Sequence, residues 1–269
     1  MADHHLHVAR PVLPTCDPAV LRYRPRAVRV LTFNIHHGVG LDGVLDLDRT
    51  ARVIEGAGAD VVALQEVDRH FGSRSGHVDQ AGWLGDRLGL EVAYGPVVDR
   101  GPVDAAAPGG PRRQYGIALL SRFPIARPRN VLLPSPHGGE QRGLLGAHVE
   151  ADGVVVRMLC THLQVRSRAE RLAQARAVAA SVAAGDGPAV VMGDLNARPG
   201  ASEIAPLTDS LVDAWITAGQ GDGHTFDAAE PYARIDYVLT SPGVVATQAA
   251  VLVTNASDHR PVMADLDIG

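Results

Sequence analysis

The sequence predicts an α/β protein whose core is a pair of mixed or antiparallel β-sheets flanked by helices. Apolar runs typical of buried strands outnumber the segments that have helical periodicity. Some neighbouring strands are joined by a hairpin signal and others by a helical segment, and this mixture disfavours a purely parallel sheet. The chain has 269 residues, 46% of them hydrophobic, which suits one large domain.

In the first half of the chain, strands alternate with two helices. The helix predicted over residues 47–56 has apolar side chains three and four positions apart and ends at glycine. A second helix, over residues 79–88, is closed by Gly89. Residues 99–113 are rich in Gly, Pro and Ala and predict a long loop that moves or faces the substrate. The strands predicted here are residues 28–33, 61–64, 92–94 and 116–121.

The second half begins with a hairpin and contains the clearest helix. Residues 144–149 and 154–161 read as antiparallel strands joined at Asp152-Gly153, a strong short hairpin signal. Residues 167–184 are rich in Ala and Arg and predict a long helix. The remaining predicted strands are residues 190–192, 235–239, 249–253 and 262–266.

Composition excludes several classes of function. The formal net charge is −5, which does not indicate a protein that binds long nucleic acid by charge alone. All 25 basic residues are arginines, so mechanisms that need a lysine nucleophile or a Schiff base are excluded. Aromatic residues make up 4% of the chain and no run reaches the ~20 apolar residues of a membrane helix, which disfavours membrane insertion.

The start of the chain differs from the rest. Residues 1–26 are rich in His, Arg and Pro and lack the apolar segment of a secretory signal. We therefore expect a flexible N-terminal lead-in, followed by one domain over residues 27–269. The two cysteines make no disulfide framework. The expected location is cytoplasmic, and the expected state is a monomer.

Polar side chains lie directly at the ends of several predicted strands. Asp194 and Asn196 follow the apolar run 189–192, and alternate residues of an extended chain share a face, so both point the same way. Proteins of the α/β class place their chemistry at strand ends, which predicts one site built from several strands. Such a set favours metal-assisted hydrolysis of a phosphate ester. The same construction recurs at Asn34, Glu66, His162 and Asp258-His259.

Short motifs in a fixed order carry a family resemblance. They are Thr32-Phe33-Asn34-Ile35-His36-His37-Gly38, Leu64-Gln65-Glu66-Val67, Tyr115-Gly116-Ile117-Ala118-Leu119-Leu120-Ser121-Arg122, Cys160-Thr161-His162-Leu163, Gly193-Asp194-Leu195-Asn196-Ala197, Arg234-Ile235-Asp236-Tyr237-Val238 and Ser257-Asp258-His259-Arg260-Pro261-Val262. In this order they resemble the endonuclease/exonuclease/phosphatase superfamily, and the first resembles its bacterial Asn-Ile-His-His variant. The resemblance implies a DNase I-like, four-layer α/β sandwich with the site at one edge.

The resemblance also implies a metal site. Glu66 resembles the main Mg²⁺ ligand of the family, and Asn34 supplies an amide oxygen beside it. Asp258 is expected to ligate the metal directly or through water. Mg²⁺ prefers hard oxygen ligands and is usually held by one or two carboxylates with several waters retained. Mn²⁺ is the alternative cation.

Five further residues match catalytic positions of the family. His259 resembles the histidine that acts as general base or as a cationic stabiliser of the attacked phosphate. Asp194 is expected to orient or deprotonate the attacking water, and Asn196 to donate to a phosphoryl oxygen. Asp236 resembles the acid that orients one of the site histidines. His162 is expected to contact the phosphate or to help the leaving oxygen depart.

Three more residues are expected near the substrate. His36 stands where some nuclease members carry a metal-holding acid, and it is expected either to donate to phosphate or to neighbour the metal. Arg142 opens a predicted strand and either contacts phosphate or has a structural role. Tyr115 is expected to touch the substrate from the edge of the loop over residues 99–113.

The motifs favour a divalent-metal-dependent phosphoesterase, either a phosphodiesterase or a phosphatase, that uses in-line attack of water. No Ser or Cys lies in a nucleophile-elbow pattern, so no covalent enzyme intermediate is expected. The expected partner is a small or lipid-derived phosphate ester. A Mg²⁺-dependent DNA or RNA nuclease is the alternative, and a catalytically silent binding module of the same fold is a third hypothesis.

Overall fold

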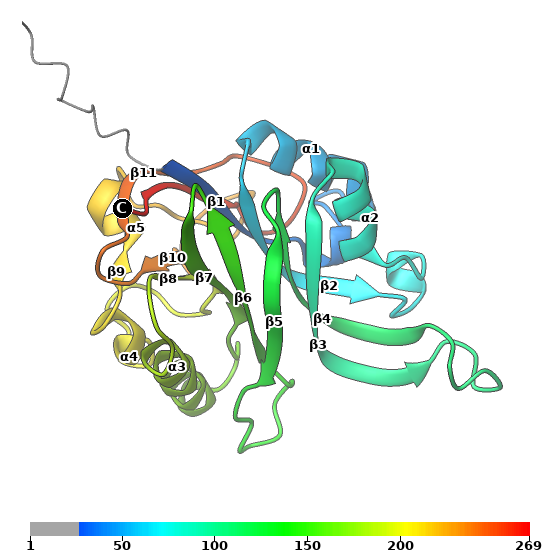
Figure 1. The fold of residues 1–269 in the computed structure, drawn as a ribbon. Coiled ribbons are helices and arrows are strands. Elements are labelled where there is room, and N and C mark those ends of the chain that lie inside the picture. The colour runs from blue at the N-terminus through cyan, green and yellow to red at the C-terminus, as the bar shows by residue number, and fades with distance from the viewer. Residues whose placement is uncertain (1–26) are drawn as a thin grey trace, which may run out of the picture.

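The computed structural model describes residues 27–269. The predicted lead-in, residues 1–26, lies outside the described residues. Two β-sheets pack face to face, with helices on their outer sides (Figure 1). The bounds of the domain predicted over residues 27–269 stay a prediction. Within the described residues, no helix is both long and apolar enough to cross a membrane.

The first sheet has six strands in the order β11-β12-β1-β2-β4-β3. Strands β1 and β2 at its centre are parallel, and every other neighbouring pair is antiparallel. The first and last strands of the described residues lie side by side in this sheet, because β1 pairs with β12. Its strands are β1 (Ala27–Asn34), β2 (Val61–Arg69), β3 (Glu91–Pro102), β4 (Arg112–Ser121), β11 (Val245–Val251) and β12 (Val262–Asp267).

The second sheet repeats this arrangement, with six strands in the order β5-β6-β7-β8-β10-β9. Strands β7 and β8 form its central parallel pair, and the other neighbours are antiparallel. Both sheets are therefore mixed, as predicted. Its strands are β5 (Ile125–Leu132), β6 (Gly143–Ala151), β7 (Val154–His162), β8 (Ala189–Asp194), β9 (Val212–Asp213) and β10 (Asp236–Thr240).

Three helices cover the outer faces of the sheets. Each begins where a polar side chain accepts a hydrogen bond from the first turn: Asp46, Asp79 and Ser167 cap α1, α2 and α3. Two shorter helices and two 3-10 turns complete the described chain. The helical elements are α1 (Leu47–Ala57), α2 (Gln80–Leu88), α3 (Arg168–Ala183), α4 (Ala205–Thr208), α5 (Ala214–Ala218), η1 (His36–Gly38) and η2 (Ser73–Ser75).

Apolar side chains form separate clusters that define the layers. One cluster, with Val30 and Met192, fills the space between the two sheets. A second, with Val178 and Leu239, lies between the second sheet and α3. A third, with Leu64, lies between the first sheet and the helices α1 and α2. The order helix, sheet, sheet, helix confirms the predicted four-layer sandwich.

The prediction of a loop over residues 99–113 is wrong. Strand β3 continues to Pro102 and β4 begins at Arg112, so the segment between the two strands is residues 103–111. Register shifts after Pro96 and Asp99 let a Gly- and Pro-rich segment stay paired. The two strands form a long hairpin that projects from the body of the sandwich (Figure 1).

Two edge strands also differ from the predictions. Strand β5 was not predicted, because it is mostly exposed and contains Pro128, features of an edge strand rather than of a buried apolar run. Strand β11 begins at Val245, four residues before the predicted start, and its exposed residues hide the pattern. Both differences lie at sheet edges and leave the central strands unchanged.

Gly193 in β8 is a position that only glycine can occupy. Its φ is 153°, and a Cβ there would lie 1.9 Å from the carbonyl oxygen of Thr161 on β7. We predict that Gly193→Ala separates these strands and lowers the free energy of unfolding by ~3 kcal/mol or more, measured by chemical denaturation. The control is Gly56→Ala in α1, where nothing lies within 4 Å and alanine should raise stability by up to ~1 kcal/mol. Similar effects of both substitutions would contradict this account.

Candidate functional site

The two parallel strand pairs end at the same edge of the sandwich. Asn34 ends β1, and its Nδ2 lies 3.2 Å from Glu66 Oε1 on β2 of the same sheet. The same Nδ2 lies 3.2 Å from Asp194 Oδ2, at the end of β8 in the other sheet. One buried amide therefore donates to carboxylates from both sheets. This contact brings together residues that are 160 positions apart in the chain.

A bulge in β2 points Glu66 into the site. The pairing of β2 with β4 shifts register between Leu64 and Val67, and Glu66 has a φ of 58°. Bulges change the direction of a side chain and are frequent beside active sites. The residues from Val61 to Gln65 are buried, whereas Glu66 is partly exposed. The bulge thus gives Glu66 access to solvent at the edge of an otherwise buried strand.

Strand register places three polar residues of the second sheet side by side. Asp194 on β8 lies opposite His162 on β7 and opposite Asp236 on β10. Residues directly opposite each other on neighbouring strands have adjacent side chains. His162 Nε2 lies 3.4 Å from Asp194 Oδ2. The sheet itself therefore assembles this half of the site.

His259 reaches the same carboxylates from the loop before β12. Its Nδ1 donates to Asp236 Oδ2 at 2.9 Å, and its Nε2 lies 3.7 Å from Asp194 Oδ2. The ring centroid of Phe226 lies 4.8 Å from that of His259, and the two residues form a β-bridge. Asp236 and Phe226 together fix the orientation of the imidazole, so that Nε2 faces Asp194.

Two of these buried groups have pKa values far from their ordinary range. Burial, together with the negative charge of Asp236, raises the pKa of Asp194 to about 7. Burial alone would lower the pKa of His259. The charges of Asp236 and Asp194 and the hydrogen bond to Asp236 outweigh it and raise that pKa to about 10. At neutral pH His259 is therefore an imidazolium between two carboxyl groups.

His162 has the opposite electrostatic character. Burial and the positive charges of Arg142 and His259 hold the pKa of His162 well below its ordinary value. Arg142 Nη1 lies 3.2 Å from Nδ1 of the ring, and Asn196 Nδ2 lies 3.0 Å from Nε2. A neutral imidazole accepts at one nitrogen only, so one of these two donors can turn to an oxygen of a bound substrate.

The carboxylates of this site, rather than the imidazolium of His259, suit a divalent cation. One ligand atom from each of Asp194, Asp236 and His259 can be chosen so that all lie within 4.8 Å of one another. Asp236 Oδ1 is buried and has no hydrogen-bond partner among the described residues. Carboxylate oxygens are the ligands that hard cations such as Mg²⁺ prefer. Glu66 is linked to Asp194 because the amide of Asn34 donates to both carboxylates.

Asp258 and His36 lie next to the amide of Asn34. The hydroxyl of Ser257 lies 2.7 Å from the backbone oxygen of Asn34 and 3.2 Å from Asp258 Oδ1. His36 donates its backbone N–H to Asn34 Oδ1 at 3.1 Å, and its Nδ1 lies 3.9 Å from Asp258 Oδ1. Sequence reasoning did not single out Ser257, although it precedes Asp258 in one of the motifs. The position of Ser257 in that motif is the sequence feature that could have indicated it.

Tyr115 and Arg142 occupy positions that differ from the simplest expectations. Tyr115 lies within β4 and is buried, rather than at the edge of a loop, because β4 begins at Arg112. Arg142 immediately precedes β6 and is also buried, with its Nη1 2.8 Å from Glu140 Oε1. Both line the same pocket as Glu66.

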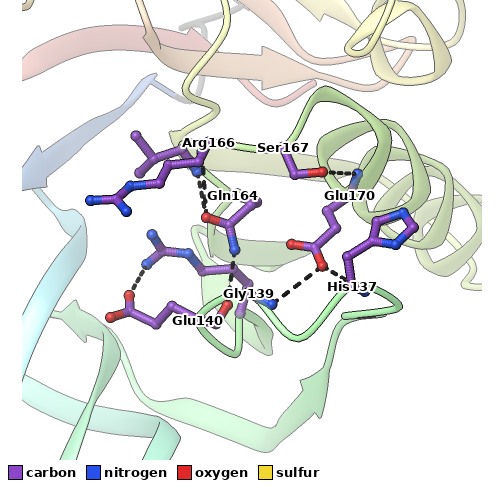
Figure 2. A pocket seen from close by; sticks show the side chains of 9 residues that line it. His137, Gly139, Glu140, Gln164, Arg166, Ser167 and Glu170 are labelled. Atoms are coloured by element: carbon purple, nitrogen blue, oxygen red, sulfur yellow. Dashed lines mark hydrogen bonds and ion pairs between the residues drawn. The ribbon is translucent and has the colours of Figure 1, made fainter.

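A second pocket, of about 460 Å³, shares Glu140 and Arg142 with this one (Figure 2). Glu170 at the start of α3 is buried beside it. Its Oε1 accepts from the backbone N–H groups of His137 and Gly139. These bonds tie α3 to the segment that leads to Arg142.

Comparison with known proteins places this site in a family. The model of the endonuclease/exonuclease/phosphatase family matches residues 31–259. The chain belongs to this family. The match runs from β1 to His259 and so includes every residue of the site described above. An endonuclease/exonuclease/phosphatase protein from Beutenbergia cavernae DSM 12333 is similar in structure, with a TM-score of 0.76 and 28% sequence identity. The alignment covers 91% of this chain and 72% of that chain.

Two other solved structures share the fold of this family member. The mannosyl-6-phosphatase of Bacteroides thetaiotaomicron VPI-5482 is 18% identical, with a TM-score of 0.73. The alignment covers 89% of this chain and 99% of that one. The catalytic domain of human Nocturnin, solved with a bound sulfate anion, is 21% identical, with a TM-score of 0.68. It covers 90% of this chain and 95% of that one.

The two carboxylates beside His259 generate a prediction about its titration. In protein treated with EDTA, the ring ¹⁵N shifts of His259 should remain those of an imidazolium between about pH 5 and pH 8, with only a small change as the neighbouring Asp194 titrates. The charge and hydrogen bond of Asp236 help to raise this pKa, so Asp236→Asn should lower it. The control is Asp222→Asn, at an exposed position of the chain. A His259 that titrates in this range in the unaltered protein would contradict the assigned charge.

Proposed function

We propose that this protein is a Mg²⁺-dependent phosphoesterase that hydrolyses a phosphate ester by in-line attack of water. The observation that supports it most directly is the approach of Glu66 and Asp194, from two different sheets, to one amide of Asn34. The family name covers nucleases and phosphatases, and both cleave phosphate esters.

Glu66, Asn34 and Asp194 would hold the cation, with Asp258 ligating directly or through water. This side of Asp194 suits Mg²⁺ better than the side that faces His259, because Glu66 is partly exposed and leaves room for retained waters. An imidazolium at His259 cannot ligate a metal. Turning the amide of Asn34 would present its oxygen to the cation. The bound metal would neutralise charge that develops on the phosphoryl oxygens, and Mn²⁺ can replace it.

Asp194 is the group that we assign to the attacking water. Its carboxylate lies between the proposed metal ligands and His259, where it would accept a proton from a water bound in the site. Its Oδ1 accepts from the backbone N–H of Asn196 at 2.9 Å, so Oδ2, which faces Asn34, His162 and His259, is the atom that would accept from the attacking water. A cation held beside it would favour the ionised form and shift its titration to lower pH.

His259 stabilises the attacked phosphoryl group as a cation. Asp236 holds its Nδ1, so the Nε2–H is the group that can donate to a phosphoryl oxygen. The high pKa of His259 favours this role over that of a general base. The positive charge is in place before the reaction and requires no proton transfer to form.

Asn196, His162 and Arg142 supply further donors for the phosphate. The neutral imidazole of His162 accepts from only one of its two neighbours, which leaves an N–H of Asn196 or Arg142 for a substrate oxygen. His162 can hold the departing oxygen from its own protonated nitrogen. No side chain needs to form a covalent bond with phosphorus.

Small phosphate esters are the substrates that we favour. The net charge of −5 does not suit a long polyanion. The similar fold of a mannosyl-6-phosphatase agrees with a phosphorylated small molecule as substrate. His36 stands beside Asn34 and Asp258, where it would neighbour the metal.

Hydrolysis of bis(p-nitrophenyl) phosphate tests this proposal. We predict activity with Mg²⁺ or Mn²⁺ and none with EDTA. Glu66→Gln and His259→Ala should each lower kcat/KM by about 10²- to 10⁴-fold, because each removes a positioned group. The matched control is Glu55→Gln, an exposed acid on the outer helix α1 that should keep the activity of the unaltered protein.

The outcomes separate the hypotheses. Unchanged rates in both site variants would refute the mechanism. No hydrolysis of this or any other ester would favour a catalytically silent binding module. A panel of sugar phosphates, inositol phosphates, sphingomyelin, RNA and plasmid DNA then identifies the substrate. Faster cleavage of the nucleic acids would identify a nuclease.

A further inference from the structure

A pocket of about 330 Å³ opens beside Glu66 and is lined by arginines. Its lining includes Arg142, which contacts His162, and the buried Tyr115. The lining also includes Arg74 from η2 and Arg100 from β3. None of the proposed catalytic steps uses Arg74 or Arg100.

Arg74 is held in place by an acid and by two aromatic rings. Its Nε and Nη2 donate to the two carboxylate oxygens of Asp68, at 2.9 and 2.7 Å, and the side chain of Asp68 is fully buried. The guanidinium also lies 4.6 Å from the ring centroid of Phe71 and 5.4 Å from that of Tyr115. The remaining nitrogen, Nη1, takes no part in the pair with Asp68.

Arg100 lies against the same aromatic ring. Its guanidinium carbon is 4.4 Å from the centroid of Phe71. The neighbouring acid, Asp99, is taken by Arg112 and Gln114, at 2.7 and 2.9 Å. Within residues 27–269, Arg100 forms no ion pair with an acid. It is an exposed cation stacked at the rim of a pocket that opens toward Glu66.

The charges around the pocket leave one cation unmatched. Arg74 is paired with Asp68, and Arg142 is paired with Glu140. The remaining acid, Glu66, is the proposed metal ligand. Arg100 therefore contributes a positive charge that nothing in the described chain neutralises, and Arg74 has a nitrogen available beside it. This arrangement suits an anion that comes with the substrate.

We propose that this pocket binds a second phosphate group of the substrate, with Arg74 and Arg100 as its ligands. The substrate class is then a phosphate ester whose organic part carries another phosphate. The guanidinium groups of Arg74 and Arg100 both lie against the ring of Phe71. Together they offer several N–H donors for the oxygens of a phosphate, which arginine recognises through paired N–H groups. The inference rests on the proposed function, since it places the scissile phosphate beside Glu66.

The pocket of about 460 Å³, which shares Arg142 with the arginine-lined pocket, suits an anion less well. It contains the buried carboxylate of Glu170 as well as Arg166, and the backbone amides near Glu170 are already occupied by it (Figure 2). Arg166 is exposed, and within the described residues its guanidinium lies over no aromatic ring and forms no ion pair. Arg166 is therefore a matched control for Arg100.

Binding of alkyl bisphosphonates tests the second-phosphate site without turnover, because their carbon–phosphorus bonds are not hydrolysed. We expect propane-1,3- or pentane-1,5-bisphosphonate to bind ~10-fold or more tightly than the corresponding alkyl monophosphonate, by calorimetry with Mg²⁺. Arg100→Gln should reduce this preference several-fold, with Arg74 still in place, while Arg166→Gln keeps it.

Three results would overturn the proposal. They are equal binding of mono- and bisphosphonates, a preference that survives Arg100→Gln, and a preference that is lost in Arg166→Gln. Arg74→Gln leaves buried Asp68 unpaired and is expected to lower stability, so the exposed Arg100 carries the test. Bisphosphonate preference without any hydrolysis of bis(p-nitrophenyl) phosphate would refute the proposed function and leave this site standing.

Turnover then distinguishes the two sources of a second phosphate. A higher kcat/KM for fructose 1,6-bisphosphate than for fructose 6-phosphate supports a small bisphosphate. A higher value for the 5′-phosphorylated thymidine dinucleotide than for the unphosphorylated dinucleotide supports a nucleic-acid strand. In either case Arg100→Gln should reduce the preference. No preference in both pairs contradicts the proposal.

Discussion

The contact of one amide with two carboxylates joins the two halves of the site. Asn34 stands at the end of a central strand in one sheet and reaches Glu66 in that sheet and Asp194 in the other. The contact requires both sheets to keep their register and their packing distance. A slip of one residue in either strand would turn the side chains to the opposite face. The repeated strand order of the two sheets brings both parallel pairs to this edge.

Burial determines the electrostatics around that contact. Asp194 and Asp236 lie next to each other in the second sheet, and His259 supplies the compensating positive charge. Removing one member of such a group would leave a buried charge without a partner, which is costly. With Glu66 added, the acids outnumber the imidazolium, so the site attracts further positive charge. The buried carboxylates cost stability, but they favour a divalent cation. The positive charge of His259 favours a phosphate.

Much of the fold could be predicted because its signals are local. Apolar runs and glycine stops locate the central strands and the helices, and strand ends locate Asn34, His162 and Asp194. Pairing across the sheet is not local: Asp236 lies opposite Asp194 only because β10 adds to β8. The direction of Glu66 depends on a bulge against β4, which the sequence does not reveal. The arginine-lined pocket draws on separate segments, so no single motif marks it.

The central claim is that the two sheets share one cation between Glu66 and Asp194. A crystal grown with Mn²⁺ and measured for anomalous scattering tests it directly. We expect one strong peak within coordination distance of a carboxylate oxygen of Glu66, on the side of Asn34 that faces Asp194. A peak enclosed by Asp194, Asp236 and His259 instead, or none near Glu66, would contradict it.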